Sequence, residues 1–321
     1  MIKKIGIIGL GSIGKRHFDV ISQYFPYIEV VIVSSKKKIE YTTKNVILVR
    51  TIEEAITLDI QAAIIASPAS FHIDQAIQLA KEGIHLLIEK PLACADSTQI
   101  KALKKIAYDS KLVLLVGYTL RYDPNLMKLK QLIDSKVYGD ILSVHIECGS
   151  YLPDWRPDQD YTNTVSAKKE LGGGVLLELS HELHYAKWIF DLTEIISAIT
   201  RNSNTLNINV EDHAVILAQS KEGYPIQINI DFCRKESKRL CRVVTINGEL
   251  HCNLLKKEIT FEENNKVVTI KANNYERNDI FLKQFKHFIK CVEGVEIPKV
   301  TIDDGINILR MISLCKNQTY E

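Results

Sequence analysis

Short apolar runs alternate with longer amphipathic stretches up to about residue 120. The apolar runs have the length of strands, and apolar residues spaced three or four apart between them indicate helices. The pattern predicts strands at 5–8, 29–34, 62–66, 84–88 and 113–117 and helices at 13–24, 73–81 and 97–110. Because continuous apolar strands that alternate with helices pair in parallel, this part of the chain predicts an α/β domain with a doubly wound parallel sheet.

The pattern changes in the second part of the chain. Longer segments alternate polar and apolar residues, which is typical of antiparallel strands with one buried face. Such strands are predicted at 141–149, 214–220, 225–232, 242–246 and 267–270, and helices at 175–190 and 279–292. We therefore predict two domains, residues 1–120 and residues 121–321. The second is expected to be an α+β domain with a large, mostly antiparallel open sheet.

Composition narrows the class of partner. Of the 321 residues, 46% are hydrophobic and 25% are charged, as in soluble globular proteins. Lys and Arg number 41 against 39 Asp and Glu, so a net charge of +2 favours neither nucleic acid nor a membrane surface. No segment has the roughly eighteen uninterrupted apolar residues of a membrane helix, and the N-terminal stretch is not predicted to be a signal peptide. Seven cysteines without a Cys-x-x-Cys pair fit a reducing cytoplasm.

A glycine-rich turn follows the first predicted strand and opens a helix. Residues 9–14 read Gly-Leu-Gly-Ser-Ile-Gly, a spacing typical of a dinucleotide site in this context. The first glycine permits the tight turn, the second lets the backbone approach a pyrophosphate, and the third lets helix pack on strand. The helix N-terminus then faces the phosphate charge. We predict cofactor contacts at Gly9, Gly11, Ser12, Ile13 and Gly14. The alternative is a glycine turn without a ligand.

The end of the second strand bears on the choice between NAD and NADP. An NAD site usually carries an Asp or Glu there, which accepts from the ribose 2′-hydroxyl. This chain has Ser34 and Ser35, followed by three lysines that start at Lys36. Hydroxyls and ammonium groups suit a 2′-phosphate, so NADP is favoured over NAD. The alternative is a solvated charged loop.

Two further segments follow predicted parallel strands. Ser67 and Pro68 come after the third strand, where a proline ends the ladder and turns the chain over the cofactor. His72 is a candidate contact for cofactor or substrate, or a helix residue without that role. Glu89 and Lys90 come after the fourth strand, where a lysine near a nicotinamide is well placed to act on a substrate oxygen. Glu89 either orients this lysine or ends the strand, and the alternative for Lys90 is a surface lysine.

These motifs resemble one known family. The turn at 9–14, the Ser67-Pro68…His72 segment, the Glu-Lys-Pro of 89–91 and a Gly-Gly-Gly at 172–174 occur in this order in the glucose-fructose oxidoreductase / inositol dehydrogenase / MocA family. The resemblance covers essentially the whole chain. It implies a Rossmann domain joined to a C-terminal domain whose open sheet often forms a dimer face, and so a homo-oligomer. It also implies oxidation or reduction of a hydroxyl or ketone of a sugar, sugar nucleotide or cyclitol.

The resemblance also implies catalytic roles. Lys90 matches the family's catalytic-site lysine and would stabilise negative charge on the reacting oxygen. The second catalytic group is expected from the other domain, where His181 resembles the family's general acid/base. Many relatives have Asp-x-x-x-His, whereas this chain has Glu178-x-x-His181, one residue shorter. Residues three apart share a helical face, so Glu178 is a third catalytic candidate. His184 occupies the place of an Asp found in sugar-nucleotide members and is a candidate substrate contact.

Other segments complete the expected site. By the same resemblance, Tyr118 and Arg121 lie beside the nicotinamide, and Tyr118 is expected at the substrate. Arg121 is expected at the cofactor, on a substrate phosphate or carboxylate, or bridging the domains. Trp155 and Arg156 lie in a loop dense in aromatic and charged residues, as sugar sites often have. Lys168 precedes the glycines and is expected to meet a phosphorylated or nucleotide-linked sugar. The alternative for the loop with Trp155 and Arg156 is a packed surface loop.

Glu178, His181 and His184 are residue types that bind metals, so a metal site is an alternative for the segment 178–184. The zinc signature needs two histidines four residues apart on a helix, whereas these are three apart. We therefore predict no metal. The predicted function is an NAD(P)-dependent oxidoreductase of a sugar-type substrate in the making of a cell-surface carbohydrate. The main alternative is a non-catalytic NAD(P)-binding redox sensor on the same fold, and a metal-dependent hydrolase is a third reading.

Overall fold

The computed structural model describes residues 2–35, 45–271 and 274–317, which form two compact units. The first unit comprises the chain up to Thr119 together with Glu276–Leu309, and the second comprises Leu120–Tyr275 with the chain from Arg310 onward. The predicted second domain, residues 121–321, therefore contained a segment that packs with the first unit. The reason for the difference lies in one helix of that segment.

The first unit contains a six-stranded parallel sheet in the order β3-β2-β1-β4-β5-β6. This is the order of a doubly wound dinucleotide-binding sheet, so the predicted α/β class is confirmed. The strands are β1 (Lys4–Ile8), β2 (Glu29–Val33), β3 (Val46–Val49), β4 (Ala62–Ile65), β5 (His85–Glu89) and β6 (Leu114–Gly117). β3 was not predicted; it lies at the edge of the sheet and its residues are only half-buried.

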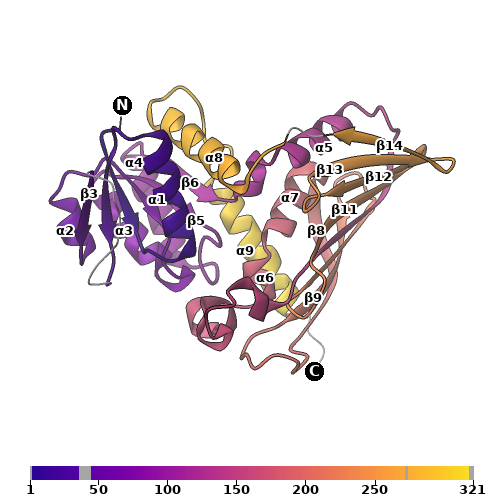
Figure 1. Cartoon of the computed structure of the whole chain (residues 1–321), viewed down its shortest axis with the longest axis horizontal. Helices are drawn as coiled ribbons and strands as arrows, with labels where there is room; N and C mark the ends of the chain where they lie inside the picture. The colour runs from indigo at the N-terminus through magenta and orange to yellow at the C-terminus, as the bar shows by residue number, and fades with distance from the viewer. Residues whose placement is uncertain (1, 36–44, 272–273, 318–321) are drawn as a thin grey trace. The chain divides into compact units, whose positions relative to one another are not determined.

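Helices of this unit are α1 (Ser12–Tyr24), α2 (Ile52–Ile56), α3 (His72–Lys81), α4 (Thr98–Asp109) and α8 (Arg277–Val292). Helix α8 contacts α1 although more than 250 residues separate them in sequence (Figure 1). Phe285 of α8 meets Phe25 edge-to-face at 5.0 Å, and Phe285 and Phe288 are buried in the same apolar core as Ile21. Burial of these aromatic rings places the segment 276–309 with the first unit.

The second unit contains an eight-stranded sheet in the order β14-β13-β12-β11-β7-β10-β9-β8. Its neighbouring strands are antiparallel except for β7 and β10, as predicted for a mostly antiparallel sheet. The strands are β7 (Ile141–Gly149), β8 (Leu192–Arg201), β9 (His213–Ser220), β10 (Pro225–Asp231), β11 (Lys238–Thr245), β12 (Gly248–Asn253), β13 (Glu258–Glu263) and β14 (Lys266–Lys271). The helices are α5 (Pro124–Asp134), α6 (Val175–Glu178) and α7 (His181–Phe190), while α9 (Ile302–Asn317) extends into this unit.

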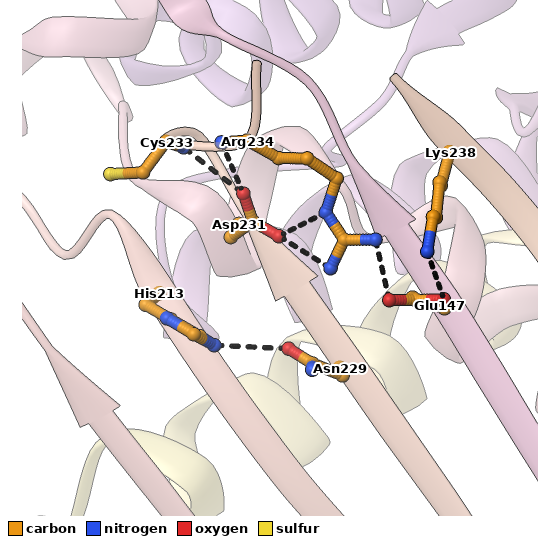
Figure 2. A network of polar contacts seen from close by, with 7 residues as sticks. All are labelled: Glu147, His213, Asn229, Asp231, Cys233, Arg234 and Lys238. Carbon is orange, nitrogen blue, oxygen red and sulfur yellow. Dashed lines mark hydrogen bonds and ion pairs between the residues drawn. The ribbon is translucent and has the colours of Figure 1, made fainter. Parts of the chain in front are cut away.

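The two faces of the large sheet differ. Helices α5, α6 and α7 lie along one face, against buried strand residues such as Ile216 and Ile228 (Figure 1). Alternate residues point to the other face, which carries polar contacts between neighbouring strands (Figure 2). Arg234 bonds both Asp231 and Glu147 there.

Candidate functional site

The turn between β1 and α1 gives its three glycines three different environments. Gly9 has a φ of +95°, and a Cβ on it would lie 2.8 Å from the backbone N of Ser67. A Cβ on Gly14 would collide with the carbonyl oxygen of Gly9, whereas one on Gly11 would meet nothing within 4 Å. Gly11 thus leaves open space beside the N-terminus of α1, where a pyrophosphate could approach the backbone. The residues present fit a dinucleotide, and the contacts predicted for Ser12 and Ile13, the first two residues of α1, stay predictions.

The end of β2 carries Ser34 and Ser35, while the predicted contact at Lys36 lies outside the described residues. The structure adds Arg50, which the sequence analysis missed. Its Nη1 donates to the carbonyl oxygen of Ser34 over 3.3 Å. A guanidinium is therefore close to the end of β2. Arg50 directly follows β3, and because that strand was not predicted, no pattern in the sequence indicated this proximity.

The loop after β4 is tied to the loop after β5 by His72, which is fully buried. Its Nδ1 lies 3.0 Å from the carbonyl oxygen of Pro91, and its Nε2 lies 2.9 Å from that of Ser67. Burial lowers the pKa of the ring. Both nitrogens of His72 thus face the chain's own backbone, and its contact with cofactor or substrate stays a prediction. The hydroxyl of Ser67 donates to Gln75 over 2.7 Å, and Pro68 precedes the turn 69–71.

The end of β5 places Lys90 beside a buried carboxylate. Glu89 is 6% exposed, its Oε1 accepts from Nε2 of His17 over 2.7 Å, and its Oε2 accepts from the backbone N of Lys90 over 3.2 Å. Both oxygens of Glu89 thus have contacts within the unit, and its contact with the cofactor stays a prediction. Lys90 itself is half-buried and is followed by a cis peptide bond to Pro91. The sequence analysis missed His17, although it falls on the buried stripe of α1 three residues after Gly14.

Tyr118 follows β6 and was predicted to contact substrate. Its side chain is 0% exposed and ranks among the largest fully buried side chains of the chain. An aromatic residue directly after a parallel strand is as compatible with the core as with a site. The contact of Tyr118 with substrate stays a prediction.

The glycines at 172–174 in the second unit serve its own packing. Gly172 and Gly174 have φ of +86° and +107°. A Cβ on Gly173 would collide with the carbonyl oxygen of Val165, and one on Gly174 with the carboxylate of Glu211. Contacts within the second unit thus account for glycine at Gly173 and Gly174.

The helix predicted over 175–190 is broken in the structure. Helix α6 ends at Glu178 and α7 begins at His181. The hydroxyl of Ser180 donates to the carbonyl oxygen of Leu177 over 2.9 Å, a local bond that competes with the helical ladder. The spacing predicted that Glu178 and His181 share one face of a continuous helix. Because the helix is broken between them, they do not. Both side chains are half-buried and reach the surface of the unit.

A buried ion pair anchors the first turn of α7. Glu182 follows His181 directly and is fully buried. Its two oxygens accept from Nε and Nη2 of Arg239 on β11 over 2.8 and 3.2 Å. This bidentate contact holds α7 on the sheet and so fixes the backbone that carries His181.

His184 and Arg121 occupy a buried corner of the second unit. His184 is 5% exposed, and burial together with the charge of Arg121 lowers its pKa to about 3. It is therefore neutral near pH 7, and its burial argues against the predicted substrate contact. The guanidinium of Arg121 stacks on the ring of Trp188, with Cζ 3.7 Å from the ring centroid. Its position at the cofactor stays a prediction.

The loop after β7 is partly ordered by its own contacts. Nε1 of Trp155 donates to the hydroxyl of Ser150 over 2.7 Å, and its ring meets Phe232 edge-to-face at 5.3 Å. Trp155, Arg156 and Lys168 are all half-buried, so part of each side chain remains accessible. These contacts do not identify a substrate, so the predicted roles of the three residues in substrate binding stay predictions.

Within residues 2–35, 45–271 and 274–317 there is no group of three His, Cys, Asp or Glu residues arranged to hold a metal ion. Among the helices that the structure describes, none has the length and apolar character required to cross a membrane.

Comparison with known proteins places the chain in a family. A family model described as "Oxidoreductase family, NAD-binding Rossmann fold" matches residues 3–118, and one for the "GFO/IDH/MocA C-terminal domain" matches residues 126–251. The chain therefore belongs to the glucose-fructose oxidoreductase / inositol dehydrogenase / MocA family, and the resemblance inferred from its motifs is confirmed.

Several relatives are similar over most of the chain. Inositol 2-dehydrogenase of Gluconacetobacter diazotrophicus is 23% identical over 70% of this chain, which spans 66% of that protein. D-xylose 1-dehydrogenase (NADP(+)) 2 of Haloferax volcanii is 24% identical over 81% of this chain and 78% of its own length. The solved structure of the WlbA dehydrogenase from Bordetella pertussis, in complex with NADH and UDP-GlcNAcA, has a TM-score of 0.81 at 21% identity and covers 99% of this chain and 96% of that chain. At this identity the likeness of structure shows the fold.

Buried histidines predict a loss of stability in acid. Burial lowers the folded-state pKa of His72 and His184, so the unfolded chain, with histidine pKa near 6.5, binds protons first as the pH falls. The stability is intact above pH ~6.5 and is lost as the pH drops towards the folded values. For His184, with a folded pKa of about 3, the loss at pH 5.5 is on the order of 1 kcal/mol. Urea unfolding at pH 7.5 and 5.5 measures it. His184→Gln should reduce the difference between the free energies of unfolding at the two pH values. If this difference is the same in the variant and the wild type, His184 is not the cause of the loss in acid.

Proposed function

We propose that this chain is an NAD(P)-dependent oxidoreductase that transfers a hydride between nicotinamide and a hydroxyl or ketone carbon of a sugar, sugar nucleotide or cyclitol. The observation that carries the proposal is local to the first unit. Open space beside Gly11 at the N-terminus of α1 and Lys90 at the end of β5 belong to the same edge of one parallel sheet. Ligands of doubly wound folds bind at this edge. A cell-surface carbohydrate remains our proposed destination for the product.

The proposed chemistry divides between two side chains. When bound, the nicotinamide supplies or accepts the hydride. The ammonium of Lys90 donates a hydrogen bond to the reacting oxygen and stabilises its developing negative charge. His181, at the accessible start of α7, exchanges the hydroxyl proton. Glu178 at the end of α6 is a further proposed contact of the substrate, which a hydroxyl-rich ring would approach as a hydrogen-bond donor.

Names of the relatives support the substrate class. They are an inositol dehydrogenase, a xylose dehydrogenase and a structure that contains UDP-GlcNAcA, so the hydroxyl-bearing ring is common to all three. A reducing cytoplasm is the proposed setting, supported by seven cysteines that are all free thiols in the structure. The class of substrate follows from screening the purified protein with NAD and NADP against cyclitols, aldoses and UDP-sugars.

Charge at the end of β2 supports a preference for NADP. No carboxylate follows that strand within residues 34–35, and Arg50 lies next to Ser34. We expect Arg50→Gln to raise the Kd for NADPH about tenfold, because a charge-assisted contact with the 2′-phosphate is lost, and to leave the Kd for NADH within twofold. Fluorescence titration measures both constants. Lys81→Gln removes an exposed cation of the same unit as a control. Equal changes for the two cofactors would contradict the preference.

Removal of the Lys90 ammonium tests catalysis directly. Lys90→Ala should lower kcat at least ~100-fold, since the charge that stabilises the reacting oxygen is absent. The Kd for the reduced cofactor should stay within threefold. Steady-state kinetics on the best substrate of the screen provides the first value and fluorescence titration the second. Lys101→Ala, an exposed lysine of α4, serves as the control. Full turnover by Lys90→Ala refutes the catalytic role, and cofactor binding without turnover of any substrate would favour the redox sensor.

We also propose a homo-oligomer formed through the sheet face that α5, α6 and α7 leave uncovered. Ile199 of β8 is paired with Val215 of β9, so both side chains point to this face, as does Leu217 two residues further along β9. Ile199 and Leu217 are 61% and 44% exposed. We expect Leu217→Glu to shift the mass from light scattering towards that of one chain. Leu255→Glu, at an exposed turn between β12 and β13, should leave the mass unchanged. If the wild-type protein has the mass of one chain at about 50 µM, the proposed oligomer is refuted.

A further inference from the structure

Glu89 is a buried carboxylate whose two oxygens have different partners. Oε1 accepts from Nε2 of His17 on α1 over 2.7 Å, and Oε2 accepts from the backbone N of Lys90 over 3.2 Å. A carboxylate this deeply buried is costly unless hydrogen bonds compensate it. The same carboxylate thus connects an internal side chain of α1 to the backbone of Lys90.

The surroundings leave Glu89 little freedom. A Cβ on Gly117 of β6 would lie 2.8 Å from both Cα and Oε2 of Glu89, so glycine there makes room for the carboxylate. His17 is 0% exposed, and its ring meets Phe281 of α8 edge-to-face at 5.2 Å. Packing thus limits Glu89 on the side of β6, and the hydrogen bond from His17 holds its Oε1 on the side of α1.

The other side of Lys90 is held separately. The carbonyl oxygen of Pro91 lies 3.0 Å from Nδ1 of His72, and that ring also contacts Ser67. Leu92 is fully buried and packs where a Cβ on Gly305 would meet it. Residues 91 and 92 are held in this way on one side of Lys90. On the other side, the backbone position of Lys90 depends on Glu89 and on the hydrogen bond that His17 makes to it.

We propose that His17 is a positioning residue for Lys90 and acts through the carboxylate of Glu89. This inference rests on the role proposed above for Lys90. His17 holds Glu89 against β6, Glu89 holds the backbone N of Lys90, and the side chain of Lys90 starts from a fixed point. Removal of the donor lets the carboxylate and the backbone of Lys90 shift, and a shift of about 1 Å in a reacting group costs on the order of 100-fold in rate.

A purely structural role predicts a different outcome. Buried charged pairs are often no more stabilising than apolar side chains of the same volume, and α1 already buries Phe18 and Ile21 beside His17. The contact is thus not required to hold α1 on the sheet. Its specific consequence is geometric and falls on Lys90, not on the cofactor turn at the start of α1.

A matched pair of amides separates geometry from packing. The amide nitrogen of His17→Gln lies about where Nε2 of the histidine lies and still reaches Oε1 of Glu89, whereas that of His17→Asn is one methylene short. We expect kcat within about fivefold of wild type for the Gln variant and at least ~30-fold lower for the Asn variant. The Kd for NADPH should stay within twofold in both, since Gly11 and its turn are unchanged. Equal kcat values in the two variants overturn the proposal, and so does a fall in kcat that is matched by weaker NADPH binding.

A double variant tests the route through Glu89. In a Glu89→Gln background, His17→Asn should change kcat by less than twofold, because the carboxylate through which it acts is already gone. If the two substitutions instead multiply their effects on kcat, His17 does not act through Glu89 and the proposal fails.

Chemical labelling tests the positioning without turnover. The rate at which acetic anhydride modifies Lys90, followed by peptide mass spectrometry of the full chain with NADPH, should change at least ~threefold in His17→Asn and stay near wild type in His17→Gln. The rate at Lys81 serves as the internal reference. An unchanged rate at Lys90 in His17→Asn overturns the proposal. Because Lys90→Ala alone decides whether Lys90 is catalytic, failure of the proposed function and failure of the positioning role give different results.

Discussion

Parallel pairing is the constraint on which the site of the first unit depends, because it brings the carboxyl ends of all six strands to one edge. Gly9 follows β1, Ser67 follows β4 and Lys90 follows β5. Backbone packing then locks these ends together: Gly9 lies against Ser67, and Gly117 lies against Glu89. A turn, a loop and a lysine that are far apart in sequence are held next to α1 by contacts that only glycine allows.

Much of the fold follows from periodicity, and the failures have physical causes. β1 and β4 are predicted because nearly all their residues are buried and apolar. β3 has four half-buried residues at the edge of the sheet, too few for a period to distinguish strand from loop. α8 is predicted as a helix, but its apolar face gives no indication that its partner is α1. Sequence order therefore assigned 276–309 to the wrong unit.

The candidate site is predictable where a backbone conformation is required and less so where a side chain must point somewhere. The spacing of Gly9, Gly11 and Gly14 predicts a tight turn at a dinucleotide, and the structure shows a steric need for glycine at Gly9 and Gly14 and open space at Gly11. His72 and Tyr118 also stand next to strand ends, yet both are buried, because histidine and tyrosine suit a core as well as a site. The relation between Glu178 and His181 required an unbroken helix, and the bond from Ser180 to Leu177 could not be foreseen from spacing.

Each proposed catalytic residue adjoins a buried glutamate. Glu89 precedes Lys90 and is bound by His17, while Glu182 follows His181 and is bound by Arg239. Since buried pairs of this kind give little net stability, their shared consequence is geometric: each fixes the backbone of its neighbour within its own unit. The two donors differ in shape. The guanidinium of Arg239 reaches both oxygens of Glu182, whereas the imidazole of His17 reaches one oxygen of Glu89 and leaves the other to the backbone N of Lys90. The carboxylate beside Lys90 therefore contacts the backbone of the residue that it positions, while the carboxylate beside His181 acts through the helix that carries it.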